Sequence, residues 1–383
     1  MSKTFCVLPW MHLATNASGA LRVCCNSTPG KNLIKKPDGT AYKLWSDDIQ
    51  QAWDSDTYKT IRKQLLNDQR PDMCARCFRE EDAGLKSARM GVNQKWIEDR
   101  EYELEPDMDI RYVDLRLGNL CNLRCRMCNP YSSNQWVDEW QALTGQDLGT
   151  DEFNRLKTMD WPENPKTWEN LFAISDTVEE IYLTGGEPTV IREQHRLLQH
   201  FIDKGTAKNI RLKYNINMTN IPKHLLEMWT EFKRVQVNCS IDAYGDLNRY
   251  IRYPSRWKAV QKTWDQIRAI PNVSYEIHCT VQMYNILNLN ELIDWTAQYD
   301  TRVYFNILNH PEELNIRVLP LALKDEAARR LEPYIELEKV QGIIDYMYAD
   351  DWSHRLDDFY TYTDVLDKSR NEKLIDHVPE LTR

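Results

Sequence analysis

Three cysteines near the middle of the chain have a spacing that can hold a metal cluster. They lie in the run Cys121-Asn-Leu-Arg-Cys125-Arg-Met-Cys128, so the pattern is C-x3-C-x2-C. Three thiolates can bind three irons of a cubic iron–sulfur cluster and leave the fourth iron open to another ligand. A closed structural site uses four protein ligands, so this triad indicates chemistry. The alternative is a zinc ion that takes its fourth ligand from a distant part of the chain.

A glycine-rich turn follows one of the predicted strands further along the chain. Residues 184–188 read Thr-Gly-Gly-Glu-Pro and include Gly185, Gly186 and Glu187. Two glycines let a backbone edge approach a ligand closely, and a carboxylate can accept hydrogen bonds from an amine. By itself the turn is only weakly informative, so its meaning depends on the cysteine triad.

The N-terminal region contains a second set of thiols. Cys6 is followed by twelve residues, a glycine, four residues and Cys24, and the pair Cys74-Ala-Arg-Cys77 comes later. Four thiolates are enough for a closed iron–sulfur cluster or for a zinc ion. Cys25 is an alternative ligand, although the spacing from the glycine favours Cys24.

The rest of the sequence predicts the elements that must position these groups. Residues 111–308 alternate short strand patterns with helical patterns, which is typical of βα units and a parallel sheet. The first crossover, at 131–177, is longer and is predicted to hold a helix and an insertion. The predicted strands are 111–117, 180–184, 210–217, 235–242, 274–282 and 302–308, and the predicted helices between the later strands are near 192–204, 222–233, 255–269 and 289–299.

These patterns divide the chain into four predicted parts. They are a metal-binding module at 1–92, a polar and acidic connector at 93–110, the βα region at 111–310 and a helical, acidic extension at 311–383. The module includes a long helical pattern. Its apolar face is predicted to contain Ile49, Trp53, Ile61, Leu65 and Leu66.

Each predicted strand alternates apolar and polar residues, so its two faces differ. The strand at 274–282, for example, places Glu276, His278 and Gln282 on one face and Ile277 and Cys279 on the other. If helices cover the apolar face, the polar face lines a cavity, as in a barrel with a polar interior. An antiparallel sheet with one face in water is the alternative.

Together, the triad and the Gly-Gly-Glu-Pro turn resemble the radical S-adenosylmethionine (radical SAM) superfamily, over residues 108–308. The resemblance implies a partial (β/α)6 TIM-type barrel. It also implies that the triad holds a [4Fe–4S] cluster whose open iron takes the amine and carboxylate of SAM, while the glycine turn contacts the amine. Later positions that match motifs of the family imply further SAM contacts, by Asn217, Ser240, Asp242, Arg252 and Gln282.

The sequence departs from the superfamily pattern at two positions. Met127 replaces the usual aromatic residue before the third cysteine, and Met218 stands where the Thr-Asn-Gly segment has its glycine. The N-terminal cysteines resemble the auxiliary-cluster domains of peptide-modifying radical enzymes, in the shorter twitch form related to SPASM domains. Those domains normally follow the barrel, whereas this one precedes it. The resemblance implies a second, auxiliary [4Fe–4S] cluster, with structural zinc as the alternative.

The two faces of the predicted strands also indicate where the remaining cysteines and two titratable residues lie. Cys239 and Cys279 fall on apolar faces, so we predict that they pack in the core. Glu276 and His278 fall on the polar face and are candidates for substrate contact or proton transfer. A satisfied polar network is the alternative for this pair.

The resemblance implies a radical SAM enzyme that abstracts hydrogen from a peptide or protein side chain and takes electrons from a donor such as a flavodoxin or ferredoxin, and we expect it to be cytoplasmic. A net charge of −9 disfavours nucleic acid, because phosphate binding needs clustered Lys and Arg. We see no signal peptide and no apolar run of membrane length. The alternatives are modification of a small metabolite, nucleotide or RNA, and a non-catalytic iron–sulfur or zinc scaffold or sensor.

Overall fold

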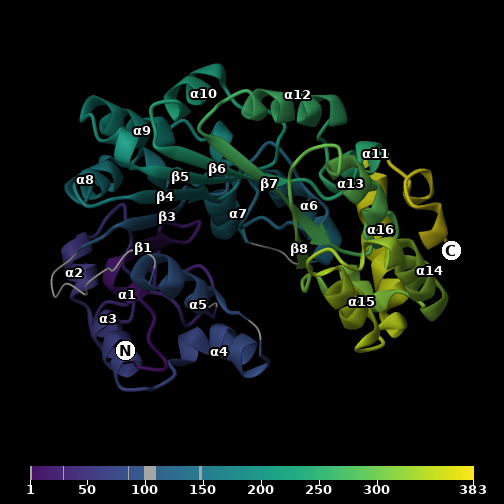
Figure 1. The fold of residues 1–383 in the computed structure, drawn as a ribbon, viewed down its shortest axis with the longest axis horizontal. Helices are drawn as coiled ribbons and strands as arrows, with labels where there is room; N and C mark the ends of the chain where they lie inside the picture. Colours follow the sequence, from purple (N-terminus) through teal and green to yellow (C-terminus); the bar gives the residue numbers. More distant parts are fainter. Residues whose placement is uncertain (1, 29, 85, 99–108, 146–148) are drawn as a thin grey trace. The chain divides into compact units, whose positions relative to one another are not determined.

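The computed structural model describes residues 1–383 except 1, 29, 85, 99–108 and 146–148. Its strands form one sheet in the order β2-β1-β3-β4-β5-β6-β7-β8 (Figure 1). All six predicted strands are present: β3 (Tyr112–Arg116), β4 (Glu180–Thr184), β5 (Arg211–Ile216), β6 (Arg234–Ser240), β7 (Val273–Val281) and β8 (Val303–Ile307).

The pairing of these strands confirms the α/β class. β3 pairs in parallel with β4, β4 with β5, and β7 with β8, so the antiparallel alternative is wrong for these pairs. β2 and β8 stand at opposite ends of the strand order, so the described sheet is open. An open sheet of this kind agrees with a partial barrel.

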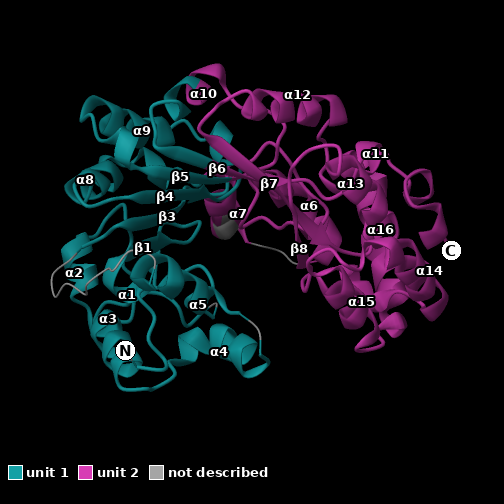
Figure 2. Cartoon of the chain, in the orientation of Figure 1, with its two compact units in different colours: residues 1–119, 159–214, 227–235 teal, residues 120–158, 215–226, 236–383 magenta. Residues whose placement is uncertain are grey.

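The chain divides into two compact units (Figure 2). The first unit contains residues 1–119, 159–214 and 227–235, and the second contains residues 120–158, 215–226 and 236–383. The four-part division predicted from the sequence stays a prediction. Residues 99–108 of the predicted connector lie outside the described residues.

The N-terminal region contributes two strands that the sequence analysis missed. β1 (His12–Thr15) pairs in parallel with β3, and β2 (Leu21–Arg22) pairs antiparallel with β1. All four residues of β1 are buried, so the strand has no alternation of polar and apolar positions. Periodicity cannot find so short a strand when both of its faces are covered.

The long helix predicted in the N-terminal region is two helices. α2 (Ile49–Trp53) ends before Ser55, which caps the start of α3 (Asp56–Leu66). Four of the five predicted apolar residues are buried, but Leu66 is 51% exposed. The prediction for Leu66 was wrong because adjacent helical residues point about 100° apart. The other helices of the first unit are α1 (Leu8–Met11), α4 (Ala75–Asp82), α5 (Ala88–Asn93), α8 (Pro165–Ala173) and α9 (Gln194–Asp203).

Helices cover the apolar face of the strands, as predicted. Trp229 of α10 (Lys223–Trp229) packs on Tyr214 of β5, with ring centroids 4.9 Å apart. In the second unit, Trp264 of α12 (Trp257–Arg268) packs on Tyr275 of β7 at 5.0 Å. Along β5, the residues that alternate with the buried ones stay partly exposed. The two faces of this strand therefore differ as the sequence predicts.

The second unit also contains the predicted helical extension. The predicted helix at 289–299 is α13 (Leu289–Thr296), and the helix missed between β6 and α12 is α11 (Gly245–Ile251). The first crossover contains α6 (Val137–Thr144) and α7 (Thr150–Lys157) before α8. The extension from residue 320 forms α14 (Leu321–Leu331), α15 (Val340–Tyr348) and α16 (Leu356–Arg370).

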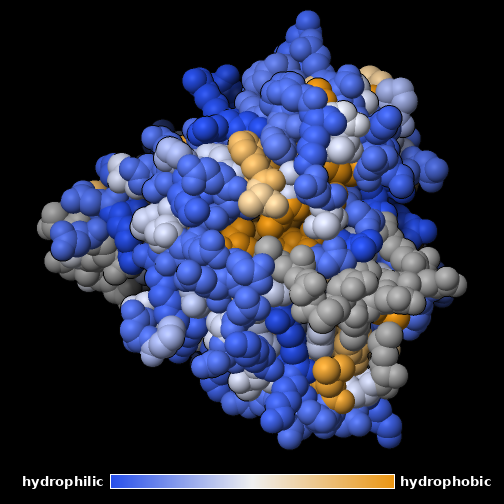
Figure 3. Space-filling model, turned by 90° about the vertical axis from the view of Figure 1, so that its left-hand side faces the viewer, coloured by the Kyte–Doolittle hydropathy of each residue, from blue (hydrophilic) through white to orange (hydrophobic). Residues whose placement is uncertain are grey.

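The surface in Figure 3 is mainly hydrophilic, with small hydrophobic patches. This agrees with a chain in which 28% of residues are charged. Among the helices that the structure describes, none combines the length and the apolar content needed to cross a bilayer.

Gly19 allows a direct test of packing in the N-terminal region. Its φ is +76°, and an added Cβ would lie 2.7 Å from Trp45 Cδ1 and 2.9 Å from Trp161 Cδ2. Gly39 has a similar φ of +84° but no heavy atom within 4 Å of an added Cβ. Both alanine variants carry the backbone cost, and only Gly19→Ala overpacks. We expect it to lower the free energy of unfolding by about 1–3 kcal/mol more than Gly39→Ala. Urea unfolding measures both variants, and equal losses would contradict this packing.

Candidate functional site

The cysteine triad lies on a loop that hydrogen bonds hold in place. Trp136 Nε1 donates to Cys125 O at 2.9 Å, and Cys128 N donates to the same carbonyl oxygen at 2.9 Å. Leu123 N donates to Cys121 Sγ at 3.4 Å. Hydrogen bonds to sulfur stabilise a ligating thiolate and tune a cluster bound to it. The loop thus brings all three thiols onto one short, fixed segment.

A second segment of the same unit, residues 251–253, pairs with this loop through backbone hydrogen bonds. Arg124 N donates to Tyr253 O at 2.7 Å, and Arg126 N donates to Ile251 O at 2.8 Å. The pairing places Arg252 beside the triad. Burial raises the pKa of the Cys125 thiol, and the guanidinium of Arg252 opposes that rise. A cation beside a cysteine favours the thiolate, which is the form that binds iron.

Arg252 and Asp242 form a buried ion pair. Arg252 Nε lies 2.7 Å from Asp242 Oδ2, and the Asp242 side chain is fully buried. Asp242 Oδ1 accepts a hydrogen bond from Thr280 N at 2.7 Å. The sequence analysis gave both residues separate contacts with SAM, whereas the structure pairs them with each other. Asp242 therefore orients Arg252, and the contact of either residue with SAM stays a prediction.

Asn217 is joined directly to the triad loop. Its Nδ2 donates to Asn122 Oδ1 at 2.7 Å, and its Oδ1 accepts from Thr219 N at 3.0 Å. The next residue, Met218, has a φ of +64°, in the left-handed region that favours glycine. The position that matches the family's glycine thus has a glycine-like conformation, although it holds a buried methionine here.

Two other predicted SAM contacts lie at strand ends in the second unit. Gln282 follows β7 and is fully buried, and its backbone N donates to Asn285 Oδ1 at 2.8 Å. Within the described residues, Gln282 Oε1 has no hydrogen-bond partner. A buried acceptor without a partner costs about 1–3 kcal/mol, so this atom fits a donor group on a ligand. Ser240 ends β6 and is partly exposed.

The Gly-Gly-Glu-Pro turn belongs to the first unit and packs on residues just after β3. Gly185 has a φ of +116°, and an added Cβ would lie 3.0 Å from Gly118 O. Gly186 N donates to the same oxygen at 3.3 Å. Glu187 is buried, and its Oε1 accepts from Thr189 N at 3.1 Å. Gly185 is thus required by its positive φ and by close backbone packing, and the contact of the turn with the amine of SAM stays a prediction.

Glu276 and His278 belong to a polar network in the second unit. Glu276 Oε1 accepts from Gln236 Nε2 at 2.7 Å and lies 3.5 Å from His278 Nε2. His278 stacks on Tyr304 at 5.1 Å, and Lys339 Nζ lies 3.4 Å from the centroid of that ring. The side chains of His278 and Glu276 stay 23% and 32% exposed. They can therefore meet a ligand, but their catalytic role stays a prediction.

The two cysteines predicted to pack in the core are fully buried. Burial raises the pKa of both thiols, Cys239 and Cys279, well above the ordinary value. Cys279 Sγ also lies 3.5 Å from Asp242 O. A buried thiol with a raised pKa is not a reactive thiolate, and its burial agrees with the predicted packing role.

Cys6 interacts with the three other predicted ligands of the N-terminal region, all in the first unit. Burial raises the pKa of the Cys6 thiol well above its ordinary value, and Cys24, Cys74 and Cys77 raise it further. Neighbouring thiols hinder one another's deprotonation. A metal ion bound among them removes this obstacle because it stabilises each thiolate. Taken over the described residues, no group of three or more His, Cys, Asp or Glu side chains could hold a metal ion. An iron–sulfur cluster binds each thiolate through a different iron, so its ligands need not meet at one point.

Cys25, the alternative ligand, interacts with a different residue. Burial and, to a smaller extent, the nearby Asp114 carboxyl together raise the pKa of its thiol to about 12. Asp114 lies on β3, is buried, and has a carboxyl pKa raised by that burial. The sequence analysis missed this pair because their contact depends on β1 and β2 joining β3. The choice of Cys24 as a ligand stays a prediction, which this geometry favours.

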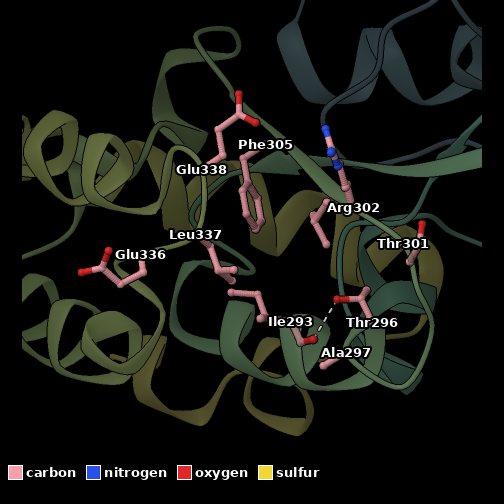
Figure 4. Close-up of a pocket in the computed structure, with 10 residues that line it drawn as sticks. Ile293, Thr296, Ala297, Thr301, Arg302, Phe305, Glu336, Leu337 and Glu338 are labelled. Carbon is pink, nitrogen blue, oxygen red and sulfur yellow. Dashed lines mark hydrogen bonds between the residues drawn. The ribbon is translucent and has the colours of Figure 1, made fainter.

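A separate cavity of about 330 Å³ in the second unit is lined by none of the predicted site residues. In Figure 4, Ile293 of α13, Phe305 of β8 and Leu337 from the loop before α15 surround it. Thr296 Oγ1 donates to Ile293 O at 2.7 Å, so this hydroxyl has a partner within its own helix. The cavity and the candidate site therefore share no residue.

Comparison with known proteins identifies the central part of the chain. The family model described as "Radical SAM superfamily" matches residues 115–294, which include the triad and the glycine turn. Over these residues the chain is therefore similar to the radical SAM superfamily. A domain of that superfamily implies a [4Fe–4S] cluster and SAM, and the three thiols, the N–H···S bond and the buried Gln282 acceptor fit that pair of cofactors.

One curated relative is the GTP 3',8-cyclase of Moorella thermoacetica. It is 26% identical over 242 residues, which cover 62% of this chain and 64% of the cyclase. The chain thus spans slightly less than two thirds of that relative. The relative is an enzyme by its name, and the family match covers the same central part of this chain.

Solved structures are similar at a lower level. The structure described as native anSMEcpe with bound AdoMet is 13% identical and has a TM-score of 0.39, covering 63% of this chain and 62% of that one. Streptococcus suis SuiB bound to precursor peptide SuiA is 12% identical, with a TM-score of 0.36 and coverage of 85% and 65%. Both TM-scores are below 0.5, too low to assign a shared function or substrate.

The Arg252–Asp242 pair yields a stability prediction. Asp242→Asn leaves a buried guanidinium without its carboxylate, so we expect the free energy of unfolding to fall by about 3–5 kcal/mol. The matched control is Asp246→Asn. Its carboxylate is 65% exposed and pairs with Arg249 at 2.6 Å, so the expected loss is below about 1 kcal/mol. Chemical denaturation measures both, and similar losses would contradict the buried pair.

Proposed function

We propose that this chain is a radical SAM enzyme that modifies a peptide or protein side chain. The observation that supports the catalytic part is the triad loop, which lies inside the matched domain and beside the Arg252–Asp242 pair. When bound, a reduced [4Fe–4S] cluster supplies the electron that splits SAM into methionine and a 5′-deoxyadenosyl radical, which takes a hydrogen atom from the substrate.

The residues around the triad would bind and orient the cofactors. Cys121, Cys125 and Cys128 hold the cluster and leave one iron for SAM. Arg252, fixed by Asp242, offers a cation beside Cys125 that suits the SAM carboxylate. Gln282 offers a buried acceptor for a hydrogen-bond donor on the ligand. Asn217 and Ser240 are further proposed SAM contacts in the same unit, and Gly185, Gly186 and Glu187 stay proposed SAM contacts from the family resemblance alone.

The N-terminal thiols support the peptide assignment. Cys6, Cys24, Cys74 and Cys77 resemble the auxiliary-cluster ligands of peptide-modifying radical enzymes, and they are close enough to raise the pKa of Cys6. We propose that they hold a second [4Fe–4S] cluster. A cytoplasmic flavodoxin or ferredoxin would then supply the electron for SAM cleavage.

A nucleotide is the second candidate substrate. The observation that favours it is the similarity to a GTP 3',8-cyclase, a protein whose name gives GTP as its substrate. The net charge of −9 weighs against a large phosphate-binding surface, but it does not oppose a single nucleotide in a local site.

SAM cleavage tests the catalytic proposal. Anaerobically reconstituted protein, reduced with dithionite, should form 5′-deoxyadenosine, and Cys125→Ala should form none because the cluster loses a ligand. Cys25→Ala is the matched control and should keep the activity. Chromatography with mass detection measures the product. Wild-type protein with full iron that forms no 5′-deoxyadenosine would refute the proposal.

The same assay distinguishes the two substrates. Peptides encoded beside this gene form one arm, and GTP forms the other. A peptide that stimulates 5′-deoxyadenosine formation and itself changes mass supports the peptide assignment. Stimulation by GTP alone would replace it with a nucleotide.

Metal analysis tests the auxiliary site. Two clusters predict about eight irons per chain, and a structural zinc predicts about four irons and one zinc. Cys24→Ala should lose the auxiliary metal and keep the triad cluster, whereas Cys25→Ala should keep both, because its thiol interacts with Asp114. Elemental analysis by mass spectrometry gives the counts. Loss of metal in Cys25→Ala but not in Cys24→Ala would reverse the assignment.

A further inference from the structure

The triad loop is attached to a helix that lies outside the matched domain. Arg126 stands between the second and third cysteines, and its side chain is fully buried. Its Nη2 lies 2.5 Å from Asp367 Oδ1 in α16 and 3.0 Å from Glu372 Oε2, two residues beyond that helix. A buried guanidinium is tolerated only when it is paired, so Arg126 depends on these two carboxylates.

Neighbouring groups fix the geometry of the pair. Arg126 Nε donates to Tyr250 O at 2.9 Å, and its Cζ lies 3.5 Å from the centroid of the Tyr250 ring. Tyr250 Oη donates to Asp367 Oδ1 at 2.9 Å, and Leu374 N donates to Asp367 Oδ2 at 2.7 Å. Both oxygens of Asp367 are therefore engaged, and the position of its carboxylate is set by the surrounding chain.

Two further links join α16 to the same loop. Tyr362 Oη donates to the backbone oxygen of Arg126 at 2.5 Å. Arg370 Nη2 lies 2.8 Å from Glu139 Oε2, and Glu139 Oε1 lies 3.2 Å from Arg124 Nη1. Arg124 stands between the first and second cysteines. The segments between the cysteines, on both sides of Cys125, thus contact α16 directly or through Glu139.

We propose that α16 is a positioning element for the candidate cluster, acting through Arg126. The proposal rests on the proposed function, because it needs a cluster at the triad. The helix fixes the shape of the loop, and positive and negative charges lie together beside the cluster, because Asp367 and Glu372 pair with Arg126 and Glu372 also pairs with Arg249. Since nearby net charge helps to set the reduction potential of an iron–sulfur cluster, this balance controls how readily the cluster accepts an electron.

Removing the charge of a carboxylate and removing the charge of Arg126 should shift the reduction potential of the cluster in opposite directions. Arg126, Asp367 and Glu372 carry a summed charge of −1, which Asp367→Asn or Glu372→Gln changes to 0 and Arg126→Met changes to −2. The first two variants should favour the reduced cluster on the order of tenfold, for a unit charge about 10 Å away. For a one-electron couple, tenfold is about 59 mV. Arg126→Met should favour the oxidised cluster by a similar factor.

A double variant and a surface variant complete the design. Arg126→Met with Asp367→Asn restores a summed charge of −1, so its potential should return toward that of the wild type. Asp364→Asn makes the same chemical change on the same helix. The Asp364 carboxylate is 70% exposed and 3.8 Å from Arg383, so no shift is expected. If Asp367→Asn alone cannot hold a cluster and the double variant can, that rescue also supports the pair.

The measurement is an anaerobic redox titration of the reconstituted full chain, followed by electron paramagnetic resonance. The signal that changes on addition of SAM reports the triad cluster, and circular dichroism confirms that each variant is folded. Folded variants with the wild-type potential would overturn the proposal, as would shifts of Asp367→Asn and Arg126→Met in the same direction. A wild-type signal that ignores SAM would instead refute the proposed function.

Discussion

The candidate site depends on one short stretch of backbone pairing, in which the triad loop binds residues 251–253. Arg124 N and Arg126 N donate to Tyr253 O and Ile251 O, so the loop takes its shape from another part of the chain. A loop with three cysteines has no regular structure of its own. The same pairing sets Arg252 beside Cys125 and aims the two spacer arginines toward their carboxylate partners. The position of the thiols and the charge around them therefore have a common origin.

The fold was largely predictable because its strands are amphipathic. Alternation found β3 to β8, and it also predicted that Cys239 and Cys279 are buried. It failed at β1, where all four residues are buried and no alternation exists. The helical pattern also placed Leu66 on the apolar face of its helix, although that residue lies at the end of α3 and is half exposed. Local patterns thus predict an element when its two faces meet different surroundings, and they fail when the surroundings are uniform.

The site was predictable where residue types and spacing carry the chemistry, as in the triad. Its supporting contacts join residues that are distant in sequence, and no spacing encodes them. Arg126 and Asp367 are 241 positions apart. The pair of Cys25 and Asp114 likewise depends on strands that only tertiary structure brings together. Asp242 likewise has partners that no motif encodes, because Arg252 and Thr280 engage its carboxylate, while its contact with SAM stays a prediction.

The contact of α16 with the triad loop has a consequence for how the protein is made. All three cysteines of the triad leave the ribosome more than 200 residues before Asp367 and Glu372. Domains tend to fold from the N-terminal side during synthesis, so the strands can form while Arg126 still lacks its partners. If α16 positions the loop as proposed, the loop reaches its final geometry only after that helix has docked. Cluster insertion would then favour complete chains, since an unfinished chain has the ligands but not their support.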